Sequence, residues 1–450
     1  MADYGKIFKA YDIRGVVPDE LDEGVAEAVG AAFATMTGAQ ALVTVHDMRT
    51  SSAPLAAAFA RGATRAGADV VDGGLGSTDM LYYASGALDI PGAMITASHN
   101  PARYNGIKLC RAGARPVGQD TGLAELKEMA MAGQAGVAAT PGSVTSRDLL
   151  AGYADYLKSL VDLSVVRPLK VAVDAGNGMA GHTVPQVLAG LPIEVVPLYF
   201  ELDGNFPNHE ANPIDPANLA DLQRAVRESS ADIGLAFDGD ADRCFVVDER
   251  GEIVSPSVLT ALIAVRELAR EPGATIIHNL ITSRAVPEIV TEHGGTPVRT
   301  RVGHSFIKAV MNSRGAIFGG EHSGHFYFRD FWFADSGMLA ALHVLAALGG
   351  QDRPLSDLLA EYSRYVASGE INTEVSDQAA ITAKVKAAYA ASPQTTADEL
   401  DGLTVGGPGW WFNLRPSNTE PLLRLNVEAD DEATLAKVTN EVLHLVSDDS

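Results

Sequence analysis

Residues 232–243 read DIGLAFDGDADR, an apolar run of strand length followed at once by a loop rich in carboxylates. A short, continuous apolar run is typical of a strand that is buried on both faces of a parallel or mixed sheet. Asp238, Asp240 and Asp242 stand directly after that run. Because open α/β sheets bind ligands beyond the carboxyl ends of their strands, this stretch indicates both the fold class and the place of a site.

Strands and helices alternate outward from this stretch in both directions. Short apolar runs predict further strands at 41–46, 92–96, 169–174 and 274–278. Helices are expected between strand signals at 54–67 and 257–271, and the apolar, Ala-rich run 338–349 predicts a core helix. This alternation is typical of βαβ units and therefore of parallel or mixed sheets.

The last part of the chain follows a different plan. Turn-forming or small polar residues mark candidate domain breaks at 135–146, 249–251 and 365–369. Beyond the last break we expect a helix at 377–391, strands on either side of a Pro/Gly loop, and a helix at 430–447. These elements predict a small α+β unit that can stand as its own domain.

Length and charge narrow the class of protein. At roughly 100–200 residues per domain, 450 residues predict about three domains, and 46% hydrophobic with 20% charged residues excludes wholesale disorder. The net charge of −23 argues against nucleic acid and anionic membranes as partners. A site for a small anionic substrate would have to gather its cations in one cleft.

The cysteines and the N-terminal residues bear on the compartment. Cys110 and Cys244 lie in strand-like runs, which predicts buried thiols in a reducing environment rather than a disulfide framework. Residues 1–15 lack the apolar core of a signal peptide, and no run of 18 apolar residues is present. We therefore expect a cytoplasmic protein with no membrane span.

The carboxylates after residue 237 have the pattern of a cation site. Asp238, Asp240 and Asp242 repel one another unless a cation relieves the repulsion, and hard oxygen ligands select Mg²⁺ or Ca²⁺. An EF-hand is rejected because Arg243 stands where that loop needs glycine and an apolar strand follows. Arg243 suggests a phosphate bound beside the metal. The alternative is a plain solvated acidic turn.

Residues 96–101, TASHNP, offer a candidate nucleophile after another strand. The Ser98 hydroxyl needs a base or an electrostatic field to become reactive. His99 is its neighbour, but adjacent side chains on an extended chain point apart, so we do not expect a Ser–His relay from these two alone. Viewed alone, the stretch is more typical of a turn in which Ser98 and Asn100 bond the backbone.

Three glycine- or proline-bearing loops complete the candidates. In 319–325, GGEHSGH, Glu321 and Ser323 can hydrogen-bond vicinal hydroxyls, and the two histidines lack a further close ligand for zinc. The stretch 415–421, RPSNTEP, has the composition of a phosphate cradle. Plain turns are the alternatives for both. The GxGxxG pattern at 176–181 predicts a tight strand-to-helix turn rather than a nucleotide site, because Asp174 would face the pyrophosphate.

Taken together, these motifs in this order, with YDIRG at 11–15 and HNPARYNGIK at 99–108, resemble the α-D-phosphohexomutase superfamily, most closely its bacterial phosphomannomutase/phosphoglucomutase branch. The resemblance runs from residue 11 to residue 421. It implies three related α/β domains with mixed sheets plus a C-terminal TATA-binding-protein-like α+β domain around a central cleft. The implied domains carry the phosphoserine loop, the metal, the sugar and the phosphate, and are expected at 1–146, 147–250, 251–366 and 367–450.

The resemblance also implies roles for single residues. Ser98 would be the phosphoserine, and it would hold Mg²⁺ together with Asp238, Asp240 and Asp242. Glu321 and Ser323 would read sugar hydroxyls. The non-transferred phosphate would be held by Arg415, Ser417, Asn418 and Thr419. The basic wall, the proton-transfer groups and further substrate contacts would come from Tyr11, Arg14, His99, Lys108, Arg243, His304 and His325.

The implied activity is that of an isomerase. It would move phosphate reversibly between the 1- and 6-positions of a hexose, mannose first and glucose second, through phosphoserine and a hexose 1,6-bisphosphate that also serves as activator. The protein would act as a monomer or homodimer on small phosphosugars. The run 279–283, NLITS, lacks the basic residue usual in this branch, with Arg284 as a candidate replacement, which leaves the sugar preference open.

Three other functions stay open from the residues. The first is a phosphoglucosamine mutase, whose sugar loop usually differs at His322. The second is a metal-dependent sugar phosphatase in which Asp238 is the nucleophile. The third is a non-catalytic phosphosugar sensor.

Overall fold

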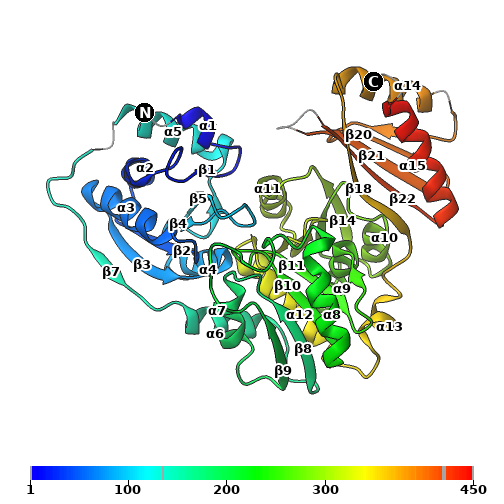
Figure 1. Cartoon of the computed structure of the whole chain (residues 1–450), viewed down its shortest axis with the longest axis horizontal. Coiled ribbons are helices and arrows are strands. Elements are labelled where there is room, and N and C mark those ends of the chain that lie inside the picture. The colour runs from blue at the N-terminus through cyan, green and yellow to red at the C-terminus, as the bar shows by residue number, and fades with distance from the viewer. Residues whose placement is uncertain (1–2, 134–135, 391, 418–421, 448–450) are drawn as a thin grey trace.

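The computed structural model describes residues 3–133, 136–390, 392–417 and 422–447, whose strands form four sheets (Figure 1). The first sheet follows the order β1 (Ile13–Val16), β5 (Tyr104–Arg111), β4 (Gly92–Ile95), β2 (Ala41–His46), β3 (Asp69–Leu75) and β7 (Val144–Ser146), and β6 (Arg115–Pro116) pairs with β5. Its helices are α1 (Tyr4–Ile7), α2 (Glu23–Thr37), α3 (Ser52–Arg65), α4 (Thr78–Leu88) and α5 (Leu123–Ala132).

The second sheet has the order β12 (Ile253–Val254), β11 (Cys244–Asp248), β10 (Ile233–Phe237), β8 (Leu169–Asp174) and β9 (Ile193–Leu198). It is accompanied by α6 (Leu150–Leu160), α7 (Ala180–Val187) and α8 (Ala220–Ser229). The third has the order β14 (Thr296–Thr300), β13 (Thr275–Asn279), β15 (Phe318–Gly320), β16 (Phe326–Phe328) and β17 (Ala334–Asp335). Its helices are α9 (Pro256–Arg270), α10 (Ala285–Glu292), α11 (His304–Arg314), α12 (Gly337–Gly349) and α13 (Leu355–Leu359).

One local plan recurs in these three sheets. A central strand pairs in parallel with one neighbour and antiparallel with the strand that follows it in the chain: β4 with β2 and β5, β10 with β8 and β11, and β15 with β13 and β16. The loop that joins each antiparallel pair therefore begins at the carboxyl end of a buried central strand. The expected mixed α/β sheets are confirmed, and the recurrence places three loops in equivalent positions.

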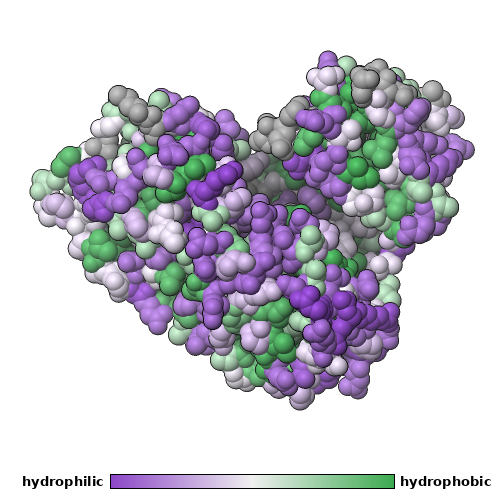
Figure 2. Space-filling model, viewed as in Figure 1, coloured by the Kyte–Doolittle hydropathy of each residue, from purple (hydrophilic) through white to green (hydrophobic). Residues whose placement is uncertain are grey.

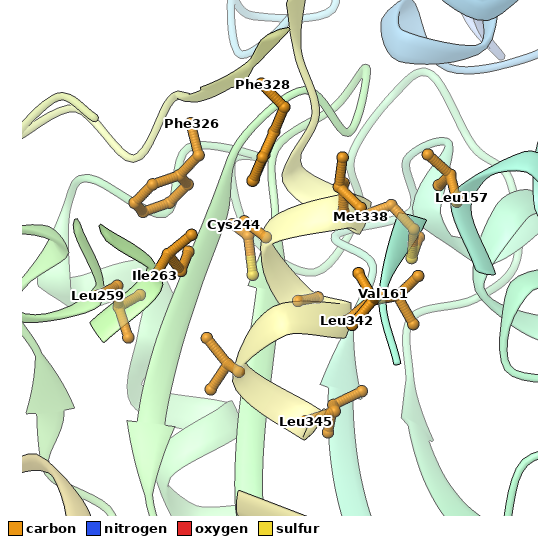
Figure 3. Packing of buried hydrophobic residues seen from close by; sticks show 14 of the residues in the cluster. Leu157, Val161, Cys244, Leu259, Ile263, Phe326, Phe328, Met338, Leu342 and Leu345 are labelled. Atoms are coloured by element: carbon orange, nitrogen blue, oxygen red, sulfur yellow. The ribbon is translucent and has the colours of Figure 1, made fainter. Parts of the chain in front are cut away.

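The second and third sheets share one apolar core. Buried Met338, Leu342 and Leu345 on α12 lie between Cys244 of β11 and two residues of the second unit, Leu157 on α6 and Val161 just after it (Figure 3). The expected core helix is confirmed, and Cys110 and Cys244 are both free and buried. This shared core fixes the loops of the second and third units relative to each other.

The fourth sheet is antiparallel and has its own core. Its order is β18 (Val366–Glu374), β22 (Leu422–Ala429), β21 (Trp410–Pro416), β20 (Leu403–Gly407) and β19 (Thr396–Asp398), with α14 (Gln378–Ala390) and α15 (Glu432–Ser447) packed together on it. The molecule is hollowed between this unit and the first one (Figure 2). The predicted α+β unit is confirmed, whereas the exact domain boundaries stay predictions. Within the described ranges, no helix is both long and apolar enough to cross a lipid bilayer.

Candidate active site

Ser98 lies in the loop between β4 and β5, and its hydroxyl is aimed at the carboxylate loop. Its Oγ donates a hydrogen bond of 2.7 Å to Asp238 Oδ2, and the residue is only 4% exposed. His99 Nδ1 lies 3.2 Å from the same Oγ. The expectation that Ser98 and His99 point apart is wrong, because Ser98 has a left-handed backbone (φ 49°) and the chain is not extended there.

The three carboxylates of the loop after β10 are buried and converge. Oxygens of Asp238, Asp240 and Asp242 lie within 4.8 Å of one another. Lys108 on β5 places its Nζ 2.7 Å from Asp240 Oδ2 and 2.6 Å from Asp242 Oδ2. Thr78, the first residue of α4, donates to Asp240 Oδ2 at 2.7 Å. The first unit thus brings a serine hydroxyl, a cation and a threonine hydrogen-bond donor to a loop of the second.

The charges in this cluster fit a divalent cation. Burial raises the pKa of Asp238 to about 8, although Arg243 opposes the rise from 2.8 Å. Burial also disfavours ionisation of Asp240, but Lys108 outweighs it and holds the pKa of Asp240 far below its usual range. Asp240 Oδ1 and Asp242 Oδ1 are buried and accept no hydrogen bond from the described residues. Buried carboxylate oxygens without hydrogen-bond partners are the hard ligands that Mg²⁺ prefers.

His99 is held as a neutral ring. Burial lowers its pKa well below the usual range, and the nearby Arg243 and Arg14 act in the same direction. Arg243 Nη2 contacts His99 Nδ1, and because a guanidinium only donates, Nδ1 must be the acceptor. That nitrogen is therefore engaged. The Ser98 proton is directed to Asp238 and not to His99.

The loop between β15 and β16 brings a second set of polar groups to the same place. Glu321 is 2% exposed and accepts hydrogen bonds from Tyr327 (2.7 Å), from Asn279 and from the Gly303 amide. Ser323 Oγ lies 2.9 Å from His325 Nδ1. His325 Nε2 lies 3.7 Å from Asp242 Oδ1, which joins this loop to the carboxylate loop.

Two arginines of the fourth unit lie near enough to the third unit to act on the charge of His322. Arg415 and Arg424 are cross-strand partners on β21 and β22, and both lie near Glu370 of β18. Burial lowers the pKa of His322 to about 3, and Arg415, His325 and Arg424 act in the same direction. Asn279 donates to His322 Nδ1 at 2.9 Å. Sequence reasoning missed Arg424, which nothing in its local pattern separates from an ordinary strand arginine.

Other predicted residues are placed as follows. Arg14 on β1 contacts Asn100 and lies 2.6 Å from Asp12, and Tyr11 packs edge-to-face on Phe306 of the third unit. Ser417 is buried, and its amide donates to the Leu422 carbonyl. Asn418, Thr419 and the side chain of His304 lie outside the described residues.

Two further expectations concern neighbouring loops. Arg284 contacts Asp430, and its guanidinium lies 4.0 Å from the Tyr365 ring centroid, at the junction of the third and fourth units. Its use in place of a basic residue near Ile281 stays a prediction. The GxGxxG stretch is a tight turn between β8 and α7, as predicted, and Asp174 there pairs with His209.

Comparison with known proteins agrees with this geometry. Four family models match: phosphoglucomutase/phosphomannomutase domain I at residues 5–134, domain II at 151–251, domain III at 256–365 and the C-terminal domain at 370–445. The chain is 42% identical over 443 residues to a Xanthomonas campestris pv. campestris protein described as phosphohexose mutases, covering 98% of each. It is 41% identical to an Escherichia coli phosphomannomutase, again covering 98% of each chain.

A solved structure matches over the same extent. The phosphoglucomutase/phosphomannomutase family protein of Burkholderia thailandensis superposes with a TM-score of 0.89 at 34% identity, covering 100% of this chain and 99% of that one. Models, sequences and structure all span the four units and the loops that meet between them. The chain belongs to the phosphoglucomutase/phosphomannomutase family.

Proposed function

We propose that this protein is a phosphomannomutase that moves phosphate reversibly between the 1- and 6-positions of mannose, with glucose as a second substrate. The observation that carries the proposal is the 2.7 Å hydrogen bond from Ser98 Oγ to Asp238, beside Lys108 and two further carboxylates. Such an arrangement suits a serine that alternately holds and releases a phosphoryl group.

Each half-reaction moves one phosphoryl group from or to Ser98 Oγ. A hydroxyl oxygen of the hexose phosphate bonds to the phosphorus on Ser98, the bond from phosphorus to Ser98 Oγ breaks, Oγ takes up a proton from a neighbouring acid, and the sugar proton passes to a base in the cleft. The product is a hexose 1,6-bisphosphate. After it turns around, Ser98 Oγ attacks its other phosphorus, the bond from that phosphorus to the sugar oxygen breaks, the Ser98 proton returns to the neighbouring acid, and the base in the cleft protonates the leaving sugar oxygen. His325, which lies beside Asp242 and Ser323, would be the base that moves the sugar proton.

The surrounding side chains align and neutralise charge. Asp238, Asp240 and Asp242 would hold Mg²⁺ with an oxygen on Ser98, and the ion would neutralise charge on the transferring phosphoryl group. Lys108 and Arg14 would bind its remaining oxygens. Tyr327 and Asn279 fix the Glu321 carboxylate, which with Ser323 would orient sugar hydroxyls. Arg415 and residues 417–419 would hold the other phosphate, joined by Arg424.

The test is a Mg²⁺-dependent assay of mannose, glucose and glucosamine 1-phosphates with catalytic hexose 1,6-bisphosphate. We expect conversion to the 6-phosphates, fastest for mannose, with no net release of inorganic phosphate. Faster turnover of the glucosamine substrate would make the protein a phosphoglucosamine mutase. Phosphate release without isomerisation would identify a phosphatase, and binding without either reaction would identify a sensor.

A further inference from the structure

Arg49 lies beneath the Ser98 loop, in the turn that follows β2, and is 3% exposed. Its guanidinium donates to four backbone carbonyls of one loop: Ser98 (2.8 Å), Asn100 (2.6 Å), Pro101 (3.0 Å) and Tyr104 (3.0 Å). Its Nε donates to Asp47, and Ser52 in turn holds that carboxylate. Among the residues that the structure describes, no other side chain donates a hydrogen bond to the Ser98 carbonyl.

This arrangement answers a specific structural problem. Ser98 adopts the left-handed conformation that non-glycine residues rarely take, and such a backbone persists only when its surroundings hold it. The turn also directs several carbonyls inward, where each needs a donor. A planar guanidinium with five N–H groups satisfies all of them at once, whereas a lysine ammonium offers three donors from a single point.

Residues of the second unit pack against Arg49 and against the Ser98 backbone. The Phe206 ring centroid lies 5.0 Å from Arg49 Cζ, and a Cβ on Gly204 would lie 2.5 Å from Arg49 Cα. A Cβ on Gly239, in the carboxylate loop, would lie 2.4 Å from the Ser98 carbonyl oxygen. The backbone at Ser98 is therefore held between Arg49 and the loop that carries Asp238.

We propose that Arg49 is a positioning residue for phosphoryl transfer: its fork of hydrogen bonds sets the Ser98 backbone so that Oγ faces Asp238. The inference rests on the proposed function, since it concerns the same serine. Arg49 itself does not touch the substrate. It acts by keeping the Ser98 oxygen in line with the sugar oxygen, and a displacement of about 1 Å at such a centre lowers the rate by about 100-fold.

The test compares Arg49→Lys and Arg49→Ala with the wild-type enzyme and with Arg167→Lys. Arg167 is a matched control because it also binds backbone carbonyls and one carboxylate, Asp232, but lies at the junction of the second and third units. Phosphate on Ser98 is counted by mass spectrometry, so that kcat is expressed per phosphorylated site. The phosphoenzyme is also mixed with mannose 1-phosphate to measure transfer against hydrolysis.

We expect Arg49→Lys to lower kcat per phosphorylated site by about 100-fold, to change KM by less than about 3-fold, and to divert phosphate to water. Arg167→Lys should leave kcat per phosphorylated site, KM and the share of phosphate lost to water near their wild-type values. Wild-type kcat and partitioning in Arg49→Lys would overturn the inference, even if its melting temperature fell. If Arg49→Ala does not fold, Phe206→Leu must show the same diversion on a smaller scale, and wild-type partitioning there counts against the inference. A wild-type enzyme without phosphate on Ser98 would overturn the proposed function as well.

Discussion

Asp79, the second residue of α4, joins the first three units and gives a prediction that the structure quantifies. Its fully buried carboxylate accepts hydrogen bonds from Tyr153 of α6 (2.7 Å) and from Ser336, the N-cap of α12 (2.5 Å), and it contacts Ser77. Burial raises its pKa from 3.8 to about 7, although these hydroxyl donors favour the ionised form. We predict that Asp79→Asn flattens the dependence of stability on pH.

The sign follows from proton linkage. Between pH 4 and pH 7 the folded protein keeps a proton on Asp79 that the unfolded chain releases, so the free energy of unfolding falls as pH rises through this window. With a folded pKa of about 7, the fall between pH 5 and pH 8 is about 3 kcal/mol. An asparagine amide does not titrate, so this contribution disappears in the variant.

The assay is urea unfolding at pH 5, 6, 7 and 8, followed by tryptophan fluorescence. Trp332 stacks on Tyr156 of α6 with ring centroids 4.9 Å apart, close to the junction, and reports its opening. Between pH 5 and pH 8, the free energy of unfolding of Asp79→Asn should fall by about 3 kcal/mol less than that of the wild type. Tyr153→Phe removes a donor to the ionised form and should extend the fall to higher pH. If the free energy of unfolding depends on pH in the same way in the wild type and in Asp79→Asn, Asp79 does not hold a raised pKa in the folded protein.

Three further predictions concern the active site. Asp240→Asn removes a candidate metal ligand, so the Mg²⁺ concentration for half-maximal rate should rise at least about 10-fold; an unchanged midpoint in a Mg²⁺ titration would exclude Asp240 as a ligand. Because burial holds the pKa of His99 well below its usual range, His99→Gln should lower kcat without changing the shape of the pH–rate profile between pH 6 and pH 8, and loss of an acidic limb would contradict a neutral His99. Lys108→Met removes the cation beside Asp240 and Asp242 and should lower kcat about 100-fold or more in the mutase assay, whereas a rate near wild type would exclude the proposed contact with phosphate.

Sequence patterns predicted the parts of this molecule that depend on neighbouring residues. The apolar run before Asp238 marks β10, and the polar residues after it mark the carboxyl end of a central strand, which the pairing of β10 with β8 and β11 confirms. The same reasoning located Ser98 at the start of the antiparallel connection from β4 to β5, whereas Glu321 was singled out by its glycine-rich loop and lies at the start of the connection from β15 to β16. Local hydrophobicity and turn chemistry suffice for such assignments.

Contacts between units could not be predicted from local sequence patterns. Lys108 meets Asp240 and Asp242 across 132 and 134 positions, a contact that depends on how the first two units dock. The left-handed backbone of Ser98 depends on Arg49, which in sequence is one polar residue in the turn after β2. The expectation that Ser98 and His99 diverge failed for this reason: it assumed an extended chain, and tertiary hydrogen bonds select another conformation.

Transfer of phosphate through Ser98 can be followed in one labelling experiment. The protein is incubated with Mg²⁺ and hexose 1,6-bisphosphate carrying labelled phosphate, digested, and mapped by mass spectrometry, and a second sample is chased with unlabelled mannose 1-phosphate. We expect label on Ser98, transfer of that label to the sugar during the chase, and neither label nor mutase activity in Ser98→Ala. Label on Asp238, or mutase activity in Ser98→Ala near that of the wild type, would contradict transfer through Ser98.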